Sequence, residues 1–286
     1  MLRFSTTDSA PLEIQITLTE PTVYLDYSVI VRLATDSLDE GRQFREVLNS
    51  TDGTLMLSWA HIIELFGLGQ GPTLERVASY LKTFGGRFAI IDADSDAVIA
   101  RENRWVPGRQ NPALDEDFMK IIAAKWDGRT ELSLGILLDA IANEDGFFQK
   151  IKVLHGEQKA NLKRIFDQQR ERYRSDANAR GLLDGAEYLY FPPGFMTDIV
   201  RKELMRECVR TNEQFNLSDG LDLYHAVVSV SYCTHVVFDR KWARRCRSIN
   251  LPAAAAVVFD GTQMNELLGI LGSKRVSSKI QIGVGN

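Results

Sequence analysis

The sequence predicts an α/β fold of three layers, α/β/α, in which helices cover both faces of a central, mostly parallel sheet. Short β-rich runs alternate with helical patterns, a succession typical of parallel sheets. The alternation stops in a long helical stretch and then resumes, which indicates one domain with an insertion. We therefore expect a single domain over residues 1–286, with its core at about 20–103 and 196–272 and a mainly helical insertion over 104–195.

The composition is that of an ordinary globular protein, with 44% hydrophobic and 25% charged residues and a net charge of −4. No apolar run reaches membrane-spanning length, and the first residues lack the pattern of a secretory signal. Cys208, Cys233 and Cys246 form no CxxC pair, which argues against structural zinc and a disulfide framework. We expect a cytoplasmic chain without membrane attachment.

The first part of the core contains three predicted strand–helix units. An alternating apolar run over 12–20 predicts an additional strand ahead of them, of the kind found at sheet edges. Ser28 is the expected N-cap of the first helix. The units pair a strand with a helix over 22–26 and 29–34, over 54–57 and 59–66, and over 88–92 and 95–101.

After residue 103 the pattern is helical, with no convincing strand before 191. The α/β alternation then returns, with helices over 196–211, 219–232 and 263–271 and strands over 235–238 and 254–259. Beyond Ser273 the chain is polar, and we expect a loose tail.

Two acidic residues follow apolar strands directly. Asp26 follows Val-Tyr-Leu and Asp239 follows Val-Val-Phe, and ligands of open parallel sheets bind at the carboxyl ends of strands. Asp92 also ends a strand, so this position alone does not identify a catalytic acid.

Two further acids lie in helices that are apolar on most sides. Burying an unpaired Glu64 there would be costly, so it needs a cation, a hydrogen-bond partner or a proton. Asp222 has similar neighbours, and Asp219 lies about one turn earlier on the same face. Any one of these acids alone is more often a cap, an ion-pair partner or a surface residue.

The segments that contain these acids resemble the motifs of the PIN-like nuclease family. The segment VYLDYS, in which Ser28 follows Asp26 by two residues, resembles the first motif of the family. The segment LSWAHIIEL, which contains Glu64, resembles the second motif. The third and fourth correspond to DLYHA, with Asp222, and VVFDR, with Asp239. The resemblance covers roughly 20–103 and 196–260, and it implies a divergent PIN-like fold with a helical insertion.

The sequence departs from the family pattern in two places. Phe238 stands where many members have Thr or Ser, and the segment between the second and third acids is much longer than in compact members. The choice between Asp219 and Asp222 as principal third ligand stays open, although the downstream spacing favours Asp222.

The resemblance implies a metal-dependent nuclease, with an endoribonuclease preferred over an enzyme acting on DNA. Mg²⁺ or Mn²⁺ would be held by oxygen ligands, which these cations prefer. The implied catalytic residues are Asp26, Glu64, Asp222 and Asp239, and the implied metal ligands are these four and Asp219. A homodimer or a regulatory protein partner is also compatible with the family.

Basic residues next to the fourth acid are candidates for phosphate binding. Arg240, Lys241 and Arg244 follow Asp239 closely, and Trp242 could stack on a base or pack in the core. Basic residues also outnumber acidic ones over 150–174, which suggests a substrate clamp or a partner surface in the insertion. Solvated helix faces explain both runs equally well.

Three other side chains lie close to the acids in sequence. Ser28 is expected to orient a carboxylate or a phosphate. His61 and His225 lie in apolar helices, where we favour structural roles such as hydrogen bonding to a carboxylate over substrate contact.

Two functions are alternatives to a nuclease. A catalytically inactive PIN-like scaffold would bind nucleic acid or protein without cleavage. A phosphatase of the haloacid dehalogenase type also places an Asp after its first strand, but Ser28 stands where that chemistry needs a second Asp.

Overall fold

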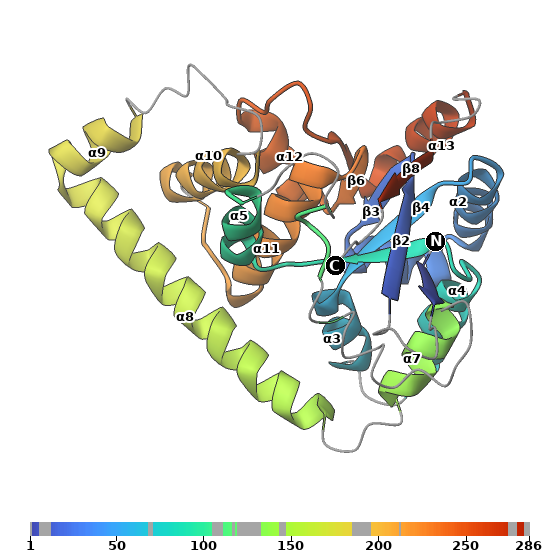
Figure 1. Cartoon of the computed structure of the whole chain (residues 1–286). Helices are drawn as coiled ribbons and strands as arrows, with labels where there is room; N and C mark the ends of the chain where they lie inside the picture. Colours follow the sequence, from blue (N-terminus) through green and yellow to red (C-terminus); the bar gives the residue numbers. More distant parts are fainter. Residues whose placement is uncertain are drawn as a thin grey trace.

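Five parallel strands form the centre of the computed structural model (Figure 1). Their order across the sheet is β5 (Phe88–Ile91), β4 (Thr54–Ser58), β3 (Thr22–Leu25), β6 (His235–Phe238) and β7 (Val257–Asp260), and every neighbouring pair is parallel. The predicted α/β class with a mostly parallel sheet is therefore confirmed.

The structure describes residues 2–5, 13–67, 71–104, 111–115, 118, 133–142, 147–184, 196–211, 213–273 and 279–282. Within these ranges, no helix combines the length and the apolar character needed to cross a membrane.

Helices lie on both sides of the sheet (Figure 1). One group packs together around α1 (Tyr27–Thr35) and consists of α2 (Leu38–Ser50), α4 (Pro72–Lys82), α7 (Leu134–Ala142) and α13 (Met264–Ser273). The other packs around α11 (Leu217–Tyr232) and consists of α5 (Ser95–Glu102), α10 (Met196–Arg210) and α12 (Arg240–Ser248). The helix α3 (Trp59–Gly67) contacts α1 and α4.

Four of the five strands, β5, β4, β3 and β6, are buried along their whole length. Both faces of such strands meet helices, which explains why their sequences are nearly continuous apolar runs. The edge strand β7 differs, since Val257 on it is 53% exposed. The sheet thus supplies a rigid, water-excluded frame for whatever residues follow its strands.

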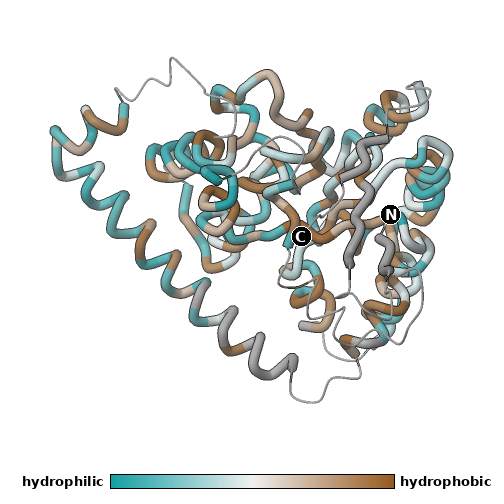
Figure 2. Tube along the Cα trace, in the orientation of Figure 1, coloured by the Kyte–Doolittle hydropathy of each residue, from teal (hydrophilic) through white to brown (hydrophobic). Residues whose placement is uncertain are grey.

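The predicted insertion is mainly helical where the structure describes it, although Leu114 forms an isolated antiparallel bridge with Ile91. It contains α7, the long α8 (Phe147–Ser175) and α9 (Ala177–Asp184). Apolar bands recur along the largely hydrophilic α8 in Figure 2, and this helix packs against α3, α10 and α11. Phe166 of α8 is buried and stacks on Phe215, with 4.2 Å between ring centroids. The insertion is therefore docked on the core.

The structure contains a second, antiparallel sheet, and part of the expected loose tail is one of its strands. It consists of β1 (Leu2–Ser5), the predicted strand β2 (Glu13–Thr19) and β8 (Lys279–Ile282), with β2 in the middle. The expected loose tail is wrong over 279–282, because Ile280 and Ile282 pair with Leu18 and Ile16. Four residues are too few for alternation to be recognised in the sequence alone.

Other boundaries differ in detail from the prediction. The N-cap of α1 is Asp26, whose side chain accepts the N–H of Ser28, so Ser28 lies inside the helix. The helices α2 and α4 were not predicted, and β7 begins at Val257.

Substitution of Gly41 tests how closely α1 and α2 pack. A Cβ at Gly41 would lie 2.4 Å from the carbonyl oxygen of Leu33, whereas a Cβ at Gly269, in the α13 helix, would meet nothing within 4 Å. We expect Gly41→Ala to lower the free energy of unfolding by about 1–3 kcal/mol. Gly269→Ala should raise it by up to about 1 kcal/mol. Urea unfolding curves measure both, and equal effects of the two substitutions would contradict this packing.

Candidate active site

The two strand-end acids lie at the same edge of the sheet. Strands β3 and β6 are parallel, with Leu25 opposite Val237, and the Asp26 N–H donates to the Val237 carbonyl at 2.8 Å. Asp26 caps α1, and Asp239 caps α12 by accepting the Trp242 N–H at 2.7 Å. Each carboxylate is therefore fixed by a strand behind it and a helix N-terminus in front of it.

Glu64 and Asp222 approach the same edge from two helices, α3 and α11. Burial and, after it, the charges of Asp26 and Asp222 together raise the pKa of Glu64 to about 8. Burial likewise raises the pKa of Asp222 to about 8, helped by the charges of Asp26 and Asp239. The charge of Asp26 acts on both Glu64 and Asp222, and the charge of Asp239 acts on both Asp26 and Asp222, so the four form one cluster, which we call the carboxylate cluster.

The pKa of Asp26 is also raised, first by burial and then by the charge of Asp239. Hydrogen bonds from Ser28 oppose this shift, because both its N–H and its hydroxyl donate to Asp26 Oδ2. Of the two expected roles of Ser28, the structure shows orientation of a carboxylate.

Trp242 connects two members of the cluster. Its indole N–H donates to Asp222 Oδ2 at 3.1 Å, while its backbone N–H caps Asp239. The side chain is only 2% exposed, and the Arg245 guanidinium lies over the ring at 4.8 Å from the centroid. Trp242 thus packs in the core and orients Asp222, which excludes the alternative of stacking on a base.

Asp219 has a different environment from Asp222. Its Oδ1 lies 2.5 Å from Lys241 Nζ and 3.6 Å from Arg245 Nη1, and its Oδ2 accepts the Asn216 N–H at 2.6 Å. These contacts form a capping box at the start of α11 and an ion pair with α12. The geometry therefore favours Asp222 over Asp219 as the third ligand.

The three basic residues expected to contact substrate are placed differently from one another. Lys241 is held by Asp219, and Arg244 forms an ion pair with Glu213. Arg240 is exposed and forms no ion pair within the described part of the chain. Arg240 is thus the best placed of the three to contact a phosphate.

Beneath the cluster lies a network of buried polar side chains. His61 Nδ1 accepts the Ser58 N–H at 3.0 Å, so the proton lies on Nε2, which donates to the Leu25 carbonyl at 2.8 Å. Burial lowers the pKa of His61 to about 4. Tyr24 contacts His225 through its hydroxyl and Nδ1. The hydrogen bonds of His61 therefore go to Ser58 and to the Leu25 carbonyl, and not to a carboxylate.

Tyr24 and Ser58 were not recognised from the sequence. The available signal was a tyrosine in an otherwise aliphatic, fully buried strand, because a buried tyrosine hydroxyl needs a hydrogen-bond partner. Asp92, the other strand-end acid, forms an ion pair with Arg101 at 2.7 Å and accepts the Asp94 N–H at 2.8 Å. Asp92 therefore has a structural role.

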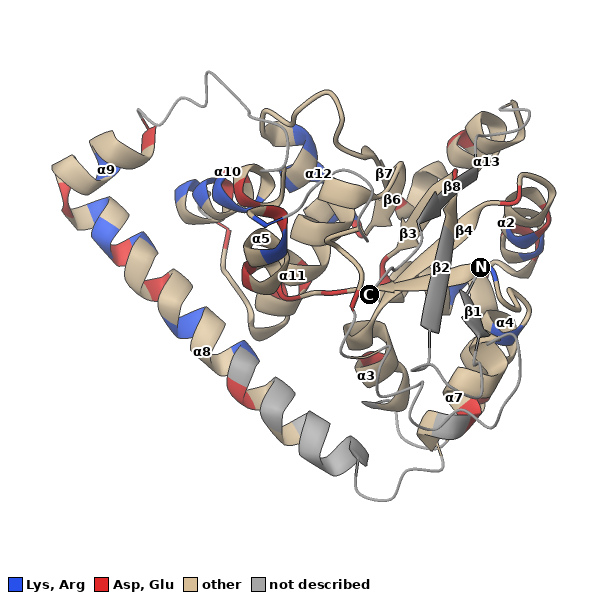
Figure 3. Ribbon diagram, viewed as in Figure 1, with Lys and Arg blue, Asp and Glu red and all other residues tan. Residues whose placement is uncertain are grey.

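The basic run of the insertion mixes structural and exposed charges. Arg170 is buried and donates to the carbonyl oxygens of Cys208, at 2.8 Å, and Thr211, at 3.1 Å. Lys163 pairs with Asp167 on the same helix. Figure 3 shows acidic and basic residues interspersed along α8. The side chains of residues 150 and 152, the first lysines of the run, lie outside the described residues.

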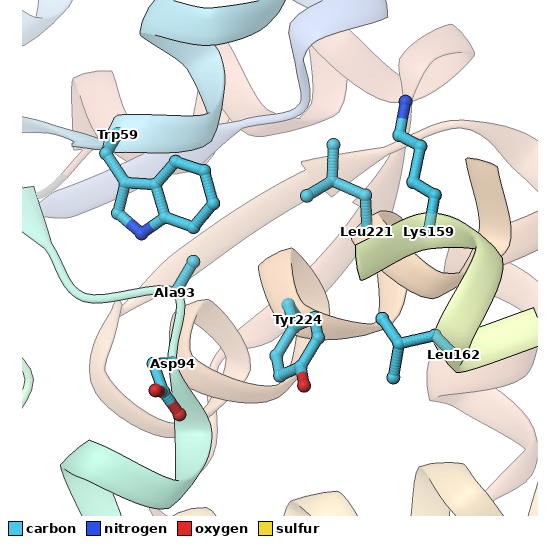
Figure 4. A pocket seen from close by; sticks show the side chains of 7 residues that line it. All are labelled: Trp59, Ala93, Asp94, Lys159, Leu162, Leu221 and Tyr224. Atoms are coloured by element: carbon cyan, nitrogen blue, oxygen red, sulfur yellow. The ribbon is translucent and has the colours of Figure 1, made fainter. Parts of the chain in front are cut away.

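A pocket of about 210 Å³ flanks the carboxylate cluster (Figure 4). The described residues that line it are Trp59, Ala93, Asp94, Lys159, Leu162, Leu221 and Tyr224. Leu221 precedes Asp222, and the positive charge of Lys159 lowers the pKa of Glu64. Sequence reasoning did not single out this pocket, because its walls come from four elements far apart in the chain.

The donor set of the cluster suits a hard divalent cation, because carboxylate oxygens are the ligands that Mg²⁺ and Mn²⁺ prefer. No three His, Cys, Asp or Glu side chains of the described residues form a ready-made metal-binding group. The acids thus form an open cluster whose mutual repulsion a cation would relieve.

The raised pKa values predict how stability depends on pH in a chelating buffer. Glu64 and Asp222 hold protons in the folded chain up to about pH 8, whereas the unfolded chain loses them near pH 4. The folded state therefore binds more protons in this window, and stability falls as the pH rises through it. Thermal melts should show this fall in the wild type. They should show a flatter profile in a Glu64→Gln, Asp222→Asn double variant, and identical profiles would contradict the electrostatic account.

Comparison of the chain with protein-family models, with curated proteins and with solved structures found no match. Any functional assignment therefore depends on the geometry and chemistry of the cluster itself.

Proposed function

We propose that the chain is a metal-dependent nuclease, acting as an endoribonuclease, that hydrolyses phosphodiester bonds at the carboxylate cluster with Mg²⁺ or Mn²⁺. The observation that carries the proposal is the convergence of Asp26, Glu64, Asp222 and Asp239 from four elements at one edge of a parallel sheet. The order of these acids along the chain and their sequence context also support a divergent PIN-like protein.

Electrostatics links the cluster to its proposed substrate. The pKa values of Asp26, Glu64 and Asp222 are raised, and the negative charge of the cluster would repel a phosphodiester. A divalent cation held there would supply a coordinated water of lowered pKa and would neutralise developing charge. Asp26 and Asp239 are proposed to hold it directly, and Glu64 and Asp222 directly or through water.

Other residues of the chain would position these ligands and the substrate. Ser28 fixes Asp26, and Trp242 fixes Asp222 and Asp239. Arg240 offers an exposed positive charge next to Asp239 for a phosphate. The phosphatase alternative loses ground because Ser28, standing where a second Asp is needed, is hydrogen-bonded to Asp26.

Cleavage assays test the nuclease proposal. Purified wild type, Asp26→Asn and Asp39→Asn are incubated with labelled single-stranded RNA and DNA, with Mn²⁺, with Mg²⁺ and with EDTA. We expect cleavage by wild type and Asp39→Asn, loss of at least about 100-fold in Asp26→Asn, and none with EDTA. Asp39 is a matched control, since its side chain is 82% exposed on α2. Binding of nucleic acid by folded wild type without cleavage would instead identify an inactive scaffold.

Metal binding supplies a test independent of cleavage. A cation must displace the protons that Glu64 and Asp222 hold up to about pH 8, so Mn²⁺ affinity should rise between about pH 6 and pH 8. Isothermal titration calorimetry in two buffers would show proton release. Glu64→Gln should weaken binding by at least about ten-fold, whereas Asp39→Asn should not. Equal affinity of wild type and Glu64→Gln would exclude this site for the metal.

A further inference from the structure

The pocket beside the carboxylate cluster has an apolar middle and two polar ends of opposite charge. Trp59, Leu162 and Leu221 supply the apolar walls. Figure 4 places the Lys159 ammonium and the Asp94 carboxylate at opposite ends, with Tyr224 nearer to Asp94. Since Lys159 acts on the charge of Glu64, the basic end is the one that faces the cluster.

The size of the pocket limits its occupant. Pockets for drug-sized ligands measure roughly 300–1,000 Å³, and this one measures about 210 Å³. An indole and a phenol ring among its walls favour a flat, aromatic occupant, because bases stack on such rings with little dependence on sequence. A single unstacked nucleobase meets both requirements.

The acidic end offers a specific hydrogen-bonding pattern. Asp94 Oδ1 accepts the N–H groups of Asp96, at 2.9 Å, and Ala97, at 3.2 Å, as the N-cap of α5. The described residues donate no hydrogen bond to its Oδ2. Tyr224 lines the same pocket and offers a phenol hydroxyl that can donate a hydrogen bond.

Guanine is the base that matches this pattern. Its Watson–Crick edge presents two adjacent donors, N1–H and N2–H, next to the acceptor O6. A carboxylate can accept from the two donors while a phenol donates to O6. Adenine, cytosine and uracil each present fewer donors to a carboxylate on this edge.

We propose that this pocket binds one unstacked guanine of a single-stranded nucleic acid, with the neighbouring phosphodiester placed at the carboxylate cluster. Trp59 stacks on the base, Asp94 and Tyr224 read its edge, and Lys159 contacts the phosphate. The inference rests on the proposed nuclease function and adds a substrate preference to it.

Binding measured without cleavage tests the pocket by itself. All variants are made in the Asp26→Asn background, in which cleavage is not expected. Fluorescence anisotropy measures their binding to short uridine RNAs with one central guanine, adenine or cytosine, and to the matching DNAs. We expect guanine to bind about ten-fold tighter than adenine. Trp59→Leu should weaken guanine binding roughly ten-fold, while Trp59→Phe, which keeps a stacking ring, should stay close to the parent.

Asp94→Asn tests the reading of the base edge. Asparagine is as good an N-cap as aspartate, so α5 should remain folded, which circular dichroism can verify. The substitution should abolish the preference for guanine and leave affinity for the all-uridine RNA unchanged. Guanine preference that survives both Trp59→Leu and Asp94→Asn would overturn the pocket assignment.

The outcomes separate the two proposals. Metal-dependent cleavage by the wild type without guanine preference would overturn the pocket and leave the nuclease. Guanine preference without any cleavage would support the pocket and overturn the nuclease. Guanosine monophosphate that competes as tightly as the guanine RNA would show that the pocket takes a free nucleotide, which overturns its assignment to a strand.

Discussion

The parallel pairing of β3 with both β4 and β6 is the constraint on which the arrangement of this molecule depends. Because β3 lies between these strands, the segments that leave its neighbours at the carboxyl end converge around Asp26. Asp239 follows β6, and Glu64 lies on the helix that follows β4. The register of Leu25 opposite Val237 therefore brings together residues more than two hundred positions apart.

The cluster has an electrostatic cost that the surrounding residues limit. In the polar network below it, burial lowers the pKa of His61 to about 4 and raises that of Tyr24, so that both side chains are uncharged near neutral pH. On α12, Lys241 pairs with Asp219 and Arg244 with Glu213, away from the four acids. Of the described residues, Lys159 lowers the pKa of Glu64, and Arg240 follows Asp239 directly. An arrangement that opposes local stability in this way is typical of sites kept for function.

The parts of the structure that depend on local sequence pattern could be predicted from the sequence. Apolar runs identified β3, β4, β5 and β6, and position after a strand or within an apolar helix singled out the four acids. Sequence reasoning could not distinguish Asp219 from Asp222, because a capping box and an ion pair to α12 depend on tertiary placement. The buried position of Trp242 and the pocket beside Trp59 also depend on tertiary placement, so they could not be predicted from the sequence. The strand β8 was missed because its partner lies at the other end of the chain.

The connectivity also orders events during synthesis. A chain emerging from the ribosome exposes Asp26 and Glu64 early, but β6 and Asp239 come only after the whole helical insertion. Because β3 cannot pair with β6 before then, the nascent chain holds only half of the cluster for most of its elongation. Fragments that end within the insertion lack Asp222 and Asp239 altogether. Synthesis beyond the insertion is thus a built-in condition for assembling the site, and products terminated before Asp239 carry no complete set of acids.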